Sequence, residues 1–248
     1  MNDQQKDKLR QCPTGEKPEI VVAIGGSAGA FQEIVKIVEY MPNWFSGTVI
    51  IATHRTPNHK NTLAELLGHK ARVAVEEPED EECLECTTIY VGNSRDRVEV
   101  DENAFDVNED VSFRARLRRI DDLFLSVAAS AGCDAVGVIL SGMLDDGTRG
   151  LKAIADAGGV CMIQCPEQAE RDSMPLNALS AVPSARIGVT EEIISWLMEM
   201  SAERGAGAVG LVAASWCCNL RQIAIGEKSR PFPNGSFRFL GSIHRGEN

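Results

Sequence analysis

The sequence is poor in aromatic residues and in positive charge. Phenylalanine, tryptophan and tyrosine together make up 5% of its 248 residues, and 25 lysines and arginines face 36 aspartates and glutamates, which gives a net charge of −11. A net negative chain argues against nucleic acid as a partner, because phosphate binding needs a basic face. Long apolar runs are also missing, so we expect a protein that is not embedded in a membrane. The polar start at residues 1–8 lacks the apolar segment of a signal peptide, which predicts a cytoplasmic location.

Cysteine and histidine are too scattered to suggest a metal site. The chain has eight cysteines and four histidines. Cys83 and Cys86 form one C-x-x-C pair, but no second pair or suitably spaced histidines accompany it. We therefore expect no bound metal, and in a cytoplasmic protein we expect the cysteines to be reduced thiols.

Apolar runs alternate with amphipathic segments along most of the chain. Runs typical of buried parallel strands lie at residues 20–24, 48–53, 135–140 and 160–164. Helical periodicity is expected at residues 31–41, 121–132, 150–157 and 191–200. This alternation predicts a single α/β domain with a doubly wound, mostly parallel sheet and helices on both faces.

The first apolar run ends in the small residues Gly25-Gly26-Ser27-Ala28-Gly29, after which apolar residues resume at helical spacing. Ser27 therefore lies on a tight turn at the carboxyl end of a strand, where open α/β folds place their sites. A hydroxyl there is a candidate nucleophile, and the glycines bring backbone N–H groups close to a developing negative charge. The spacing is not G-x-S-x-G, and a serine that only caps the following helix is the alternative.

Two further strands end in residues that suit acyl transfer. The run at 48–53 ends at His54, and the run at 135–140 leads into a polar loop with adjacent Asp145 and Asp146. A serine hydroxyl becomes a good nucleophile when an imidazole accepts its proton, and a carboxylate orients that imidazole. Parallel strands deliver their carboxyl ends to one edge of the sheet, so these residues can converge. Spacing alone does not choose between the two aspartates.

A basic patch precedes the expected helix at 121–132. It consists of Arg114, Arg116, Arg118 and Arg119. We interpret it as a solvated helix entry, with contact to an acidic partner surface as the alternative.

Five motifs occur together in a characteristic order. They are Ala-Ile-Gly-Gly-Ser-Ala-Gly at 23–29, Ala-Thr-His-Arg-Thr-Pro at 52–57, Asp-Asp-Leu-Phe-Leu-Ser-Val-Ala at 121–128, Leu-Ser-Gly-Met-Leu-Asp-Asp-Gly at 140–147 and Ser-Met-Pro-Leu-Asn-Ala at 173–178. Together they resemble the catalytic domain of the chemotaxis receptor methylesterases, the CheB family. The resemblance implies a catalytic domain over residues 18–198, a polar lead-in at 1–17 and a C-terminal extension of unknown role at 199–248.

The resemblance also implies an activity. Family members are doubly wound serine hydrolases that remove methyl groups from glutamyl methyl esters on cytoplasmic chemoreceptor helices, and many also deamidate glutamines there. By motif position, Ser27 resembles the nucleophile, His54 the general base and Asp146 the orienting carboxylate. Met143 matches the methionine whose backbone amide is associated with the oxyanion hole, and Ala28 joins it as an oxyanion or substrate residue. No metal or organic cofactor is implied.

Several positions depart from the family pattern. Ala28-Gly29-Ala30 stands where a threonine and two glycines are usual, and Leu144 stands where glycine is common. The usual Pro-Gly-x-x-His is absent around residues 91–95. The short lead-in leaves no room for the usual receiver domain, so we expect constitutive activity or control by a separate regulator. These departures leave two alternatives to a methylesterase, a receptor-binding module with weak or no turnover and a hydrolase of small esters.

Overall fold

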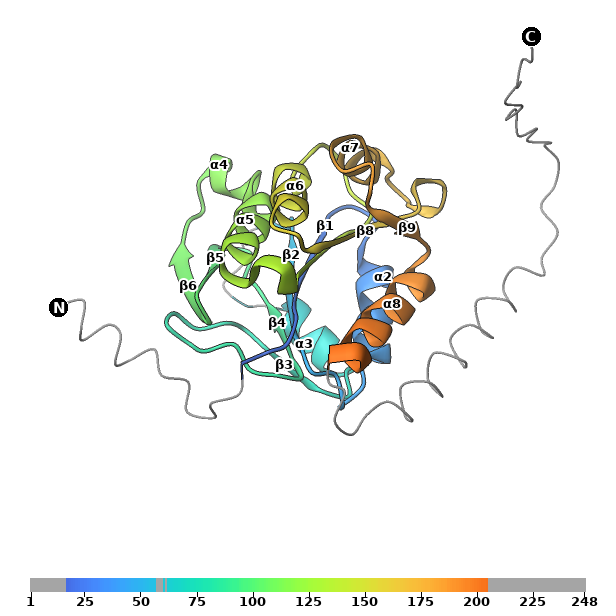
Figure 1. Cartoon of the computed structure of the whole chain (residues 1–248). Coiled ribbons are helices and arrows are strands. Elements are labelled where there is room, and N and C mark those ends of the chain that lie inside the picture. The colour runs from blue at the N-terminus through green and yellow to red at the C-terminus, as the bar shows by residue number, and fades with distance from the viewer. Residues whose placement is uncertain (1–16, 57–59, 61, 205–248) are drawn as a thin grey trace, which may run out of the picture.

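The structure is a computed structural model that describes residues 17–56, 60 and 62–204 (Figure 1). Nearly all of the expected lead-in at 1–17 and most of the expected extension at 199–248 lie outside these residues. The described part of the chain folds around one central sheet. Its strands, in chain order, are β1 (Val21–Gly26), β2 (Thr48–Thr53), β3 (Ala74–Glu76), β4 (Thr88–Val91), β7 (Ala135–Ile139), β8 (Val160–Gln164) and β9 (Arg186–Gly188). They lie in the order β3-β4-β2-β1-β7-β8-β9, and each neighbouring pair is parallel.

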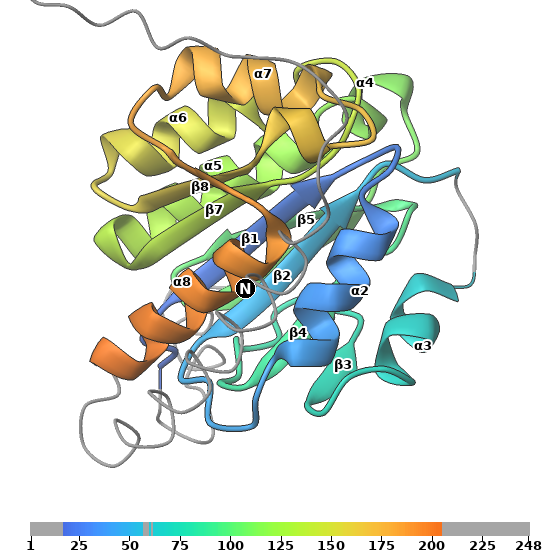
Figure 2. The same ribbon diagram turned by 90° about the vertical axis from the view of Figure 1, so that its right-hand side faces the viewer.

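Helices cover both faces of this sheet. One face carries α2 (Phe31–Tyr40), α3 (Thr62–Gly68) and α8 (Thr190–Arg204). The other face carries α5 (Arg119–Ala131), α6 (Thr148–Asp156) and α7 (Ser173–Ala181). Figure 2 shows the two helical layers on opposite sides of the strands. This arrangement confirms the predicted doubly wound α/β fold.

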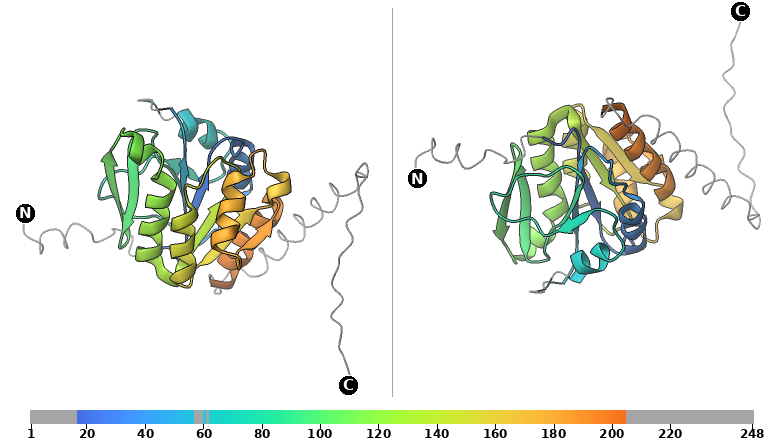
Figure 3. Two further views of the ribbon diagram at one scale, coloured as in Figure 1. Left: turned by 90° about the horizontal axis from the view of Figure 1, so that it is seen from above. Right: turned by 90° about the horizontal axis from the view of Figure 1, so that it is seen from below.

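An antiparallel hairpin lies beside α5. It consists of β5 (Asp96–Asp101) and β6 (Ala104–Glu109) and is followed by the single-turn helix α4 (Phe113–Arg116). Seen from above in the left panel of Figure 3, the hairpin, α5, α6 and α7 lie in a row. Two 3-10 turns complete the described elements, η1 (Gly132–Asp134) and η2 (Pro166–Gln168).

The strands are buried on both faces, which explains why they are apolar runs rather than alternating patterns. In β1, Val22 and Ile24 pack into the layer formed with α2 and α8, while Val21 and Ala23 pack into the layer formed with α5 and α6. Successive side chains of a strand point to opposite faces, so one short run contributes to two cores.

The structure corrects the sequence interpretation of the basic patch, and it contains two short elements that gave no sequence signal. Arg119 is 6% exposed, so the solvated reading of the basic patch is wrong at this residue. α4 and β9 were not predicted, because α4 is a single turn and β9 has only three residues. The turn of α4 is held by Ser112 Oγ, which accepts the Ala115 N–H at 3.1 Å.

Gly25 allows the start of α5 to approach the sheet. A methyl group on Gly25 would lie 2.3 Å from Ile120 Cγ2 and 3.3 Å from Ile139 Cδ1. Gly147 borders the same Ile120 side chain, since its added methyl group would lie 2.6 Å from Ile120 Cγ2. The two glycines therefore let the first turn of α5 pack directly against β1 and against the residue before α6.

We expect Gly25→Ala to lower the free energy of unfolding by roughly 1–3 kcal/mol, because the added methyl group overpacks a filled core. Urea denaturation measures this effect. Gly68→Ala is the matched control, since its added methyl group makes only an ordinary contact, 3.9 Å from Val75 Cβ. Equal midpoints for the two variants would contradict the close packing of Ile120 on Gly25.

Candidate active site

The ends of β1, β2 and β7 bring the predicted site residues to one edge of the sheet. Gly26 pairs with Thr53, so Ser27 and His54 are the first residues after two aligned strand ends. On the other side of β1, the Ser27 N–H donates to the Ser141 carbonyl at 2.9 Å, just beyond the end of β7. The chain winds outward from β1 in both directions, and open α/β sheets bind ligands at such a reversal of strand order.

Ser27 lies half-buried on the turn between β1 and α2. Gly29 has a φ of +82°, a left-handed conformation that glycine adopts without strain. The N-cap residue of α2 is Ala30, and no side chain caps this helix, so the alternative role of Ser27 as a helix cap is wrong. Ser27 Oγ forms no hydrogen bond with any residue among 17–56, 60 and 62–204, which leaves the hydroxyl available for chemistry.

His54 and Asp146 form a direct hydrogen bond. His54 Nε2 lies 2.6 Å from Asp146 Oδ2. Asp146 is 3% exposed, whereas its neighbour Asp145 is exposed. The geometry therefore separates two adjacent aspartates that their spacing in the sequence could not.

The start of α5 holds the Asp146 carboxylate. Asp146 Oδ2 accepts the Ile120 N–H at 3.1 Å, and Oδ1 accepts the Asp121 N–H at 2.8 Å. These are two of the unpaired backbone donors that every helix start presents, at the positive end of the helix dipole. These two hydrogen bonds fix the orientation of the Asp146 carboxylate against the start of α5.

Asp121 performs the reciprocal task for α6. Its side chain is fully buried, and its Oδ1 accepts the Gly150 N–H in the first turn of α6 at 2.9 Å. Arg118 Nη1 lies 3.0 Å from the other oxygen, Oδ2. Two carboxylates therefore link the starts of the two helices. Asp146, which precedes α6, accepts N–H groups of α5, and Asp121 of α5 accepts an N–H group of α6. The sequence analysis missed this role of Asp121, because capping between helices leaves no local spacing signal.

Ser141 connects the nucleophile turn to the rest of the edge. Its N–H donates to Gln164 Oε1 at 2.7 Å, and its hydroxyl donates to the Ala28 carbonyl at 2.8 Å. The same hydroxyl accepts the Arg171 N–H at 2.9 Å. Together with the hydrogen bond from the Ser27 N–H, these contacts connect the turn around Ser27 to Ser141, and Ser141 in turn to Gln164 and Arg171. Sequence reasoning missed these roles of Ser141 and Gln164, because the contacts join residues far apart in the sequence.

The loop between β7 and α6 carries Met143 and Leu144, both exposed. Leu144 has a φ of 68°, the left-handed region that favours glycine. Its backbone is tied to α7, since its N–H donates to Ser173 Oγ at 3.1 Å and its carbonyl accepts from Asn177 Nδ2 at 2.7 Å. The loop is thus held in place although its side chains face outward.

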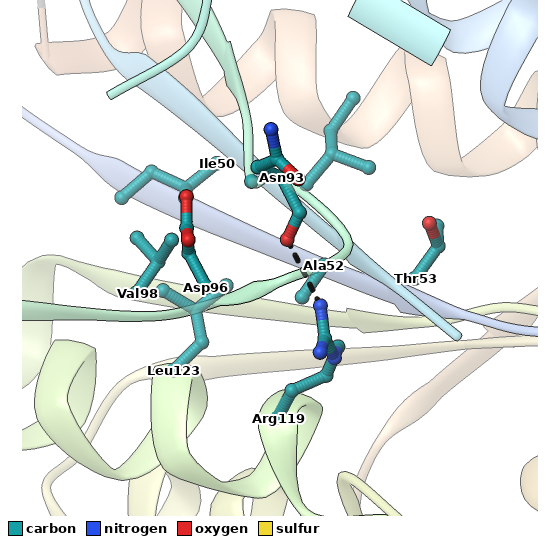
Figure 4. A pocket seen from close by; sticks show the side chains of 10 residues that line it. Ile50, Ala52, Thr53, Asn93, Asp96, Val98, Arg119 and Leu123 are labelled. Carbon is teal, nitrogen blue, oxygen red and sulfur yellow. Dashed lines mark hydrogen bonds between the residues drawn. The ribbon is translucent and has the colours of Figure 1, made fainter. Parts of the chain in front are cut away.

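Buried Arg119 and half-buried Arg55 support the loop that follows β4. Arg119 donates to the carbonyls of Asn93 and Ser94, each at 3.0 Å, and Arg55 Nη2 donates to the Gly92 carbonyl. These contacts reach backbone atoms, so they do not require the Pro-Gly-x-x-His side chains that this chain lacks. Arg119 rises from α5 toward Asn93 beside a small cavity of about 10 Å³ (Figure 4).

The two guanidinium groups influence each other. Burial, followed by repulsion from Arg119, lowers the pKa of Arg55 to about 10. Burial also lowers the pKa of Arg119, while attraction to Asp146 opposes that shift. A pKa of about 10 leaves Arg55 charged near neutral pH, and Arg119 brings a positive charge near Asp146.

The cysteines and acidic residues form no metal centre in the part of the chain that the structure describes. Cys83 is disulfide-bonded, so the expectation of reduced thiols is wrong for this residue. Spacing along the sequence does not show which thiols meet in space. Among the described helices, none is long and apolar enough to cross a bilayer.

Comparison with known proteins adds a family to this geometry. A family model described as CheB methylesterase matches residues 22–197. A protein-glutamate methylesterase/protein-glutamine glutaminase 1 of Carboxydothermus hydrogenoformans is 29% identical over 189 residues, and the match covers 72% of this chain and 56% of that protein. A protein of the same name from Chromobacterium violaceum is 30% identical over 212 residues, with coverage of 82% and 56%.

A solved structure shares the fold. The crystal structure of the Thermotoga maritima CheB methylesterase catalytic domain superposes with a TM-score of 0.68 at 22% sequence identity. The match covers 73% of this chain and 98% of that domain. By contrast, the chain spans about half the length of the curated relatives it matches.

Proposed function

We propose that this chain, which belongs to the CheB methylesterase family, is a serine esterase that hydrolyses glutamyl methyl esters of a protein substrate. The observation that carries the proposal is the 2.6 Å hydrogen bond between His54 and Asp146, formed at the same sheet edge as the turn that carries Ser27. The relatives are named as protein-glutamate methylesterases, which supports this substrate class.

In the proposed reaction, Ser27 Oγ attacks the ester carbonyl and passes its proton to His54. Asp146 engages Nε2 of the imidazole, so Nδ1 is the nitrogen that takes the serine proton. His54 then gives this proton to the leaving oxygen, and methanol departs. The glutamyl ester of Ser27 that remains is hydrolysed by water, with His54 again acting as base. Asp146 stabilises the imidazolium that forms in both steps.

The oxyanion of the tetrahedral intermediate needs backbone donors. We propose the N–H groups of Ala28 and Met143 for this role. In serine hydrolases of α/β fold, the residue after the nucleophile supplies one such donor, which corresponds here to Ala28. The loop that carries Met143 comes close to the nucleophile, since a methyl group added to Gly142 would lie 3.1 Å from Ser27 Cβ.

We further propose methylated chemoreceptor helices, or a related signalling receptor, as the substrate. Deamidation of glutamine follows the same chemistry with ammonia as the leaving group. The relatives carry this second activity in their name.

Release of methanol from methylated chemoreceptor cytoplasmic fragments tests the proposal. We expect the full chain to release methanol catalytically, without added metal or cofactor. A folded chain that binds several receptors but releases no methanol from any of them would favour the receptor-binding module instead. Turnover of a free methyl ester with no turnover of receptor would favour a small-ester hydrolase.

A further inference from the structure

The candidate active site is bordered by an exposed apolar surface. Met143 and Leu144 expose their side chains on the loop after β7, and Leu176 does so on the first turn of α7. We call these three residues the apolar rim. The hydrogen bond from Asn177 to the Leu144 carbonyl joins the loop to α7, so the rim is one surface. Single exposed apolar residues are normal, but a group of them beside a reactive site indicates a binding surface.

Folding alone does not explain Leu144. The residue adopts a φ of 68°, which is strained for a branched side chain, and it is 60% exposed. Glycine adopts this conformation without strain. A strained residue whose side chain gains little burial points to a role outside the folded core, since such outliers cluster at functional sites.

The rim is continuous with the reacting groups. Gly142, next to Met143, lies close to Ser27, since a methyl group added to it would lie 3.1 Å from Ser27 Cβ. Asp146 follows Leu144 by two residues. A segment that lies on the rim therefore passes directly beside the nucleophile.

An arginine-lined basin of about 500 Å³ lies near the other end of the same loop, where the chain enters α6. Its arginines are Arg97, Arg114, Arg118 and Arg149. Arg118 is close enough to Asp145 for their attraction to raise its pKa, after the larger effect of its hydrogen bond to Asp121. The basin and the rim thus flank one loop.

The charge in this basin suits single carboxylates. Asp110 and Asp122 share its lining, and Asp121 engages both Arg118 and Arg149. Arg114 forms no ion pair with any residue that the structure describes. Positive charge that is already partly balanced, on a chain of net charge −11, favours a few glutamate side chains over a polyanion.

We propose that the apolar rim and the arginine basin together dock an amphipathic helix of the protein substrate. Apolar side chains of that helix lie on Leu144, Met143 and Leu176, and glutamates beside the reacting residue reach Arg114 and Arg149. The inference rests on the proposed function in naming the partner as the substrate, but docking is measured without turnover.

The test uses the full chain with Ser27→Ala, which holds the probe without hydrolysing it. The probe is a fluorescent helical peptide of roughly 20 residues, about 30 Å long, with leucines on one face, flanking glutamates and one central glutamyl methyl ester. A matched peptide has glutamine in place of the leucines. We expect the leucine peptide to bind about tenfold more tightly, and we expect Leu144→Gly or Leu176→Gln to remove most of that difference.

Leu66→Ala is the control, because Leu66 is an equally exposed leucine on α3, away from the site. It is expected to keep the preference, and the thermal midpoint of Leu144→Gly is expected not to fall. Arg114→Gln is expected to weaken binding at low salt and to have little effect at high salt. Equal affinity for the two peptides, or an unchanged preference in Leu144→Gly, overturns the docking proposal. If Leu144→Gly loses the preference for the leucine peptide but the wild-type chain releases no methanol, the docking proposal stands and the proposed esterase is overturned.

Discussion

Ser27→Ala is expected to lower kcat/KM for a methylated receptor fragment by about 10⁴- to 10⁶-fold, because no other group in the proposed triad replaces a missing nucleophile. The free energy of unfolding is expected to change by no more than about 0.5 kcal/mol, since the Ser27 hydroxyl bonds to no described residue. Methanol release under single-turnover conditions measures the first effect, and urea denaturation measures the second.

Ser180→Ala is the matched control for this variant. Ser180 is an exposed serine on α7, so its replacement is expected to leave both rate and stability unchanged. A Ser27→Ala chain that still releases methanol within tenfold of the wild-type rate would show that another residue is the nucleophile. Because Ser27 lies half-buried on a rigid turn, a loss of rate without a loss of stability assigns the hydroxyl a chemical task.

Much of this fold was predictable because its strands are buried on both faces. The continuous runs at β1, β2, β7 and β8 are apolar for that reason, and their order along the chain alternates with helices. β9 gave no such signal, since Arg186 and Ile187 are exposed on a three-residue edge strand. Strand order and register, by contrast, depend on contacts between residues far apart in the sequence.

The sequence also predicted where the main residues of the candidate site lie. The sequence places Ser27, His54 and an aspartate after strand ends, and parallel pairing brings strand ends together. Spacing could not choose between Asp145 and Asp146, although the family resemblance implied Asp146. In the structure, the hydrogen bonds of Asp146 to the start of α5 and to His54 separate the two. The sequence also could not show that Arg119 turns inward while Arg118 stays half-exposed, since both belong to one basic run.

Asp146→Asn has the second large expected effect, and it acts on rate and stability together. The two oxygens of Asp146 accept three N–H groups, from His54, Ile120 and Asp121. An asparagine has one acceptor oxygen and an NH₂ group, so in either orientation its NH₂ faces a backbone N–H of α5. One buried donor is left unpaired, which is expected to lower the free energy of unfolding by about 1–3 kcal/mol.

The same replacement disturbs the proposed base. If the asparagine oxygen faces Asp121, its NH₂ faces His54 Nε2, which then must accept rather than donate, and the proton moves to Nδ1. Nδ1 is the nitrogen proposed to take the Ser27 proton, so the wrong tautomer is expected to lower kcat by about 10⁴-fold, as for the same change in a serine protease triad. Asp145→Asn is the matched control, since the carboxylate of this exposed neighbour forms no hydrogen bond with a described residue. The replacement also keeps the Asp145 carbonyl, which accepts the Thr148 N–H at 3.1 Å. If the two asparagine variants lost the same amount of activity, Asp146 would not be the orienting carboxylate, and its buried place between His54 and α5 would serve folding alone.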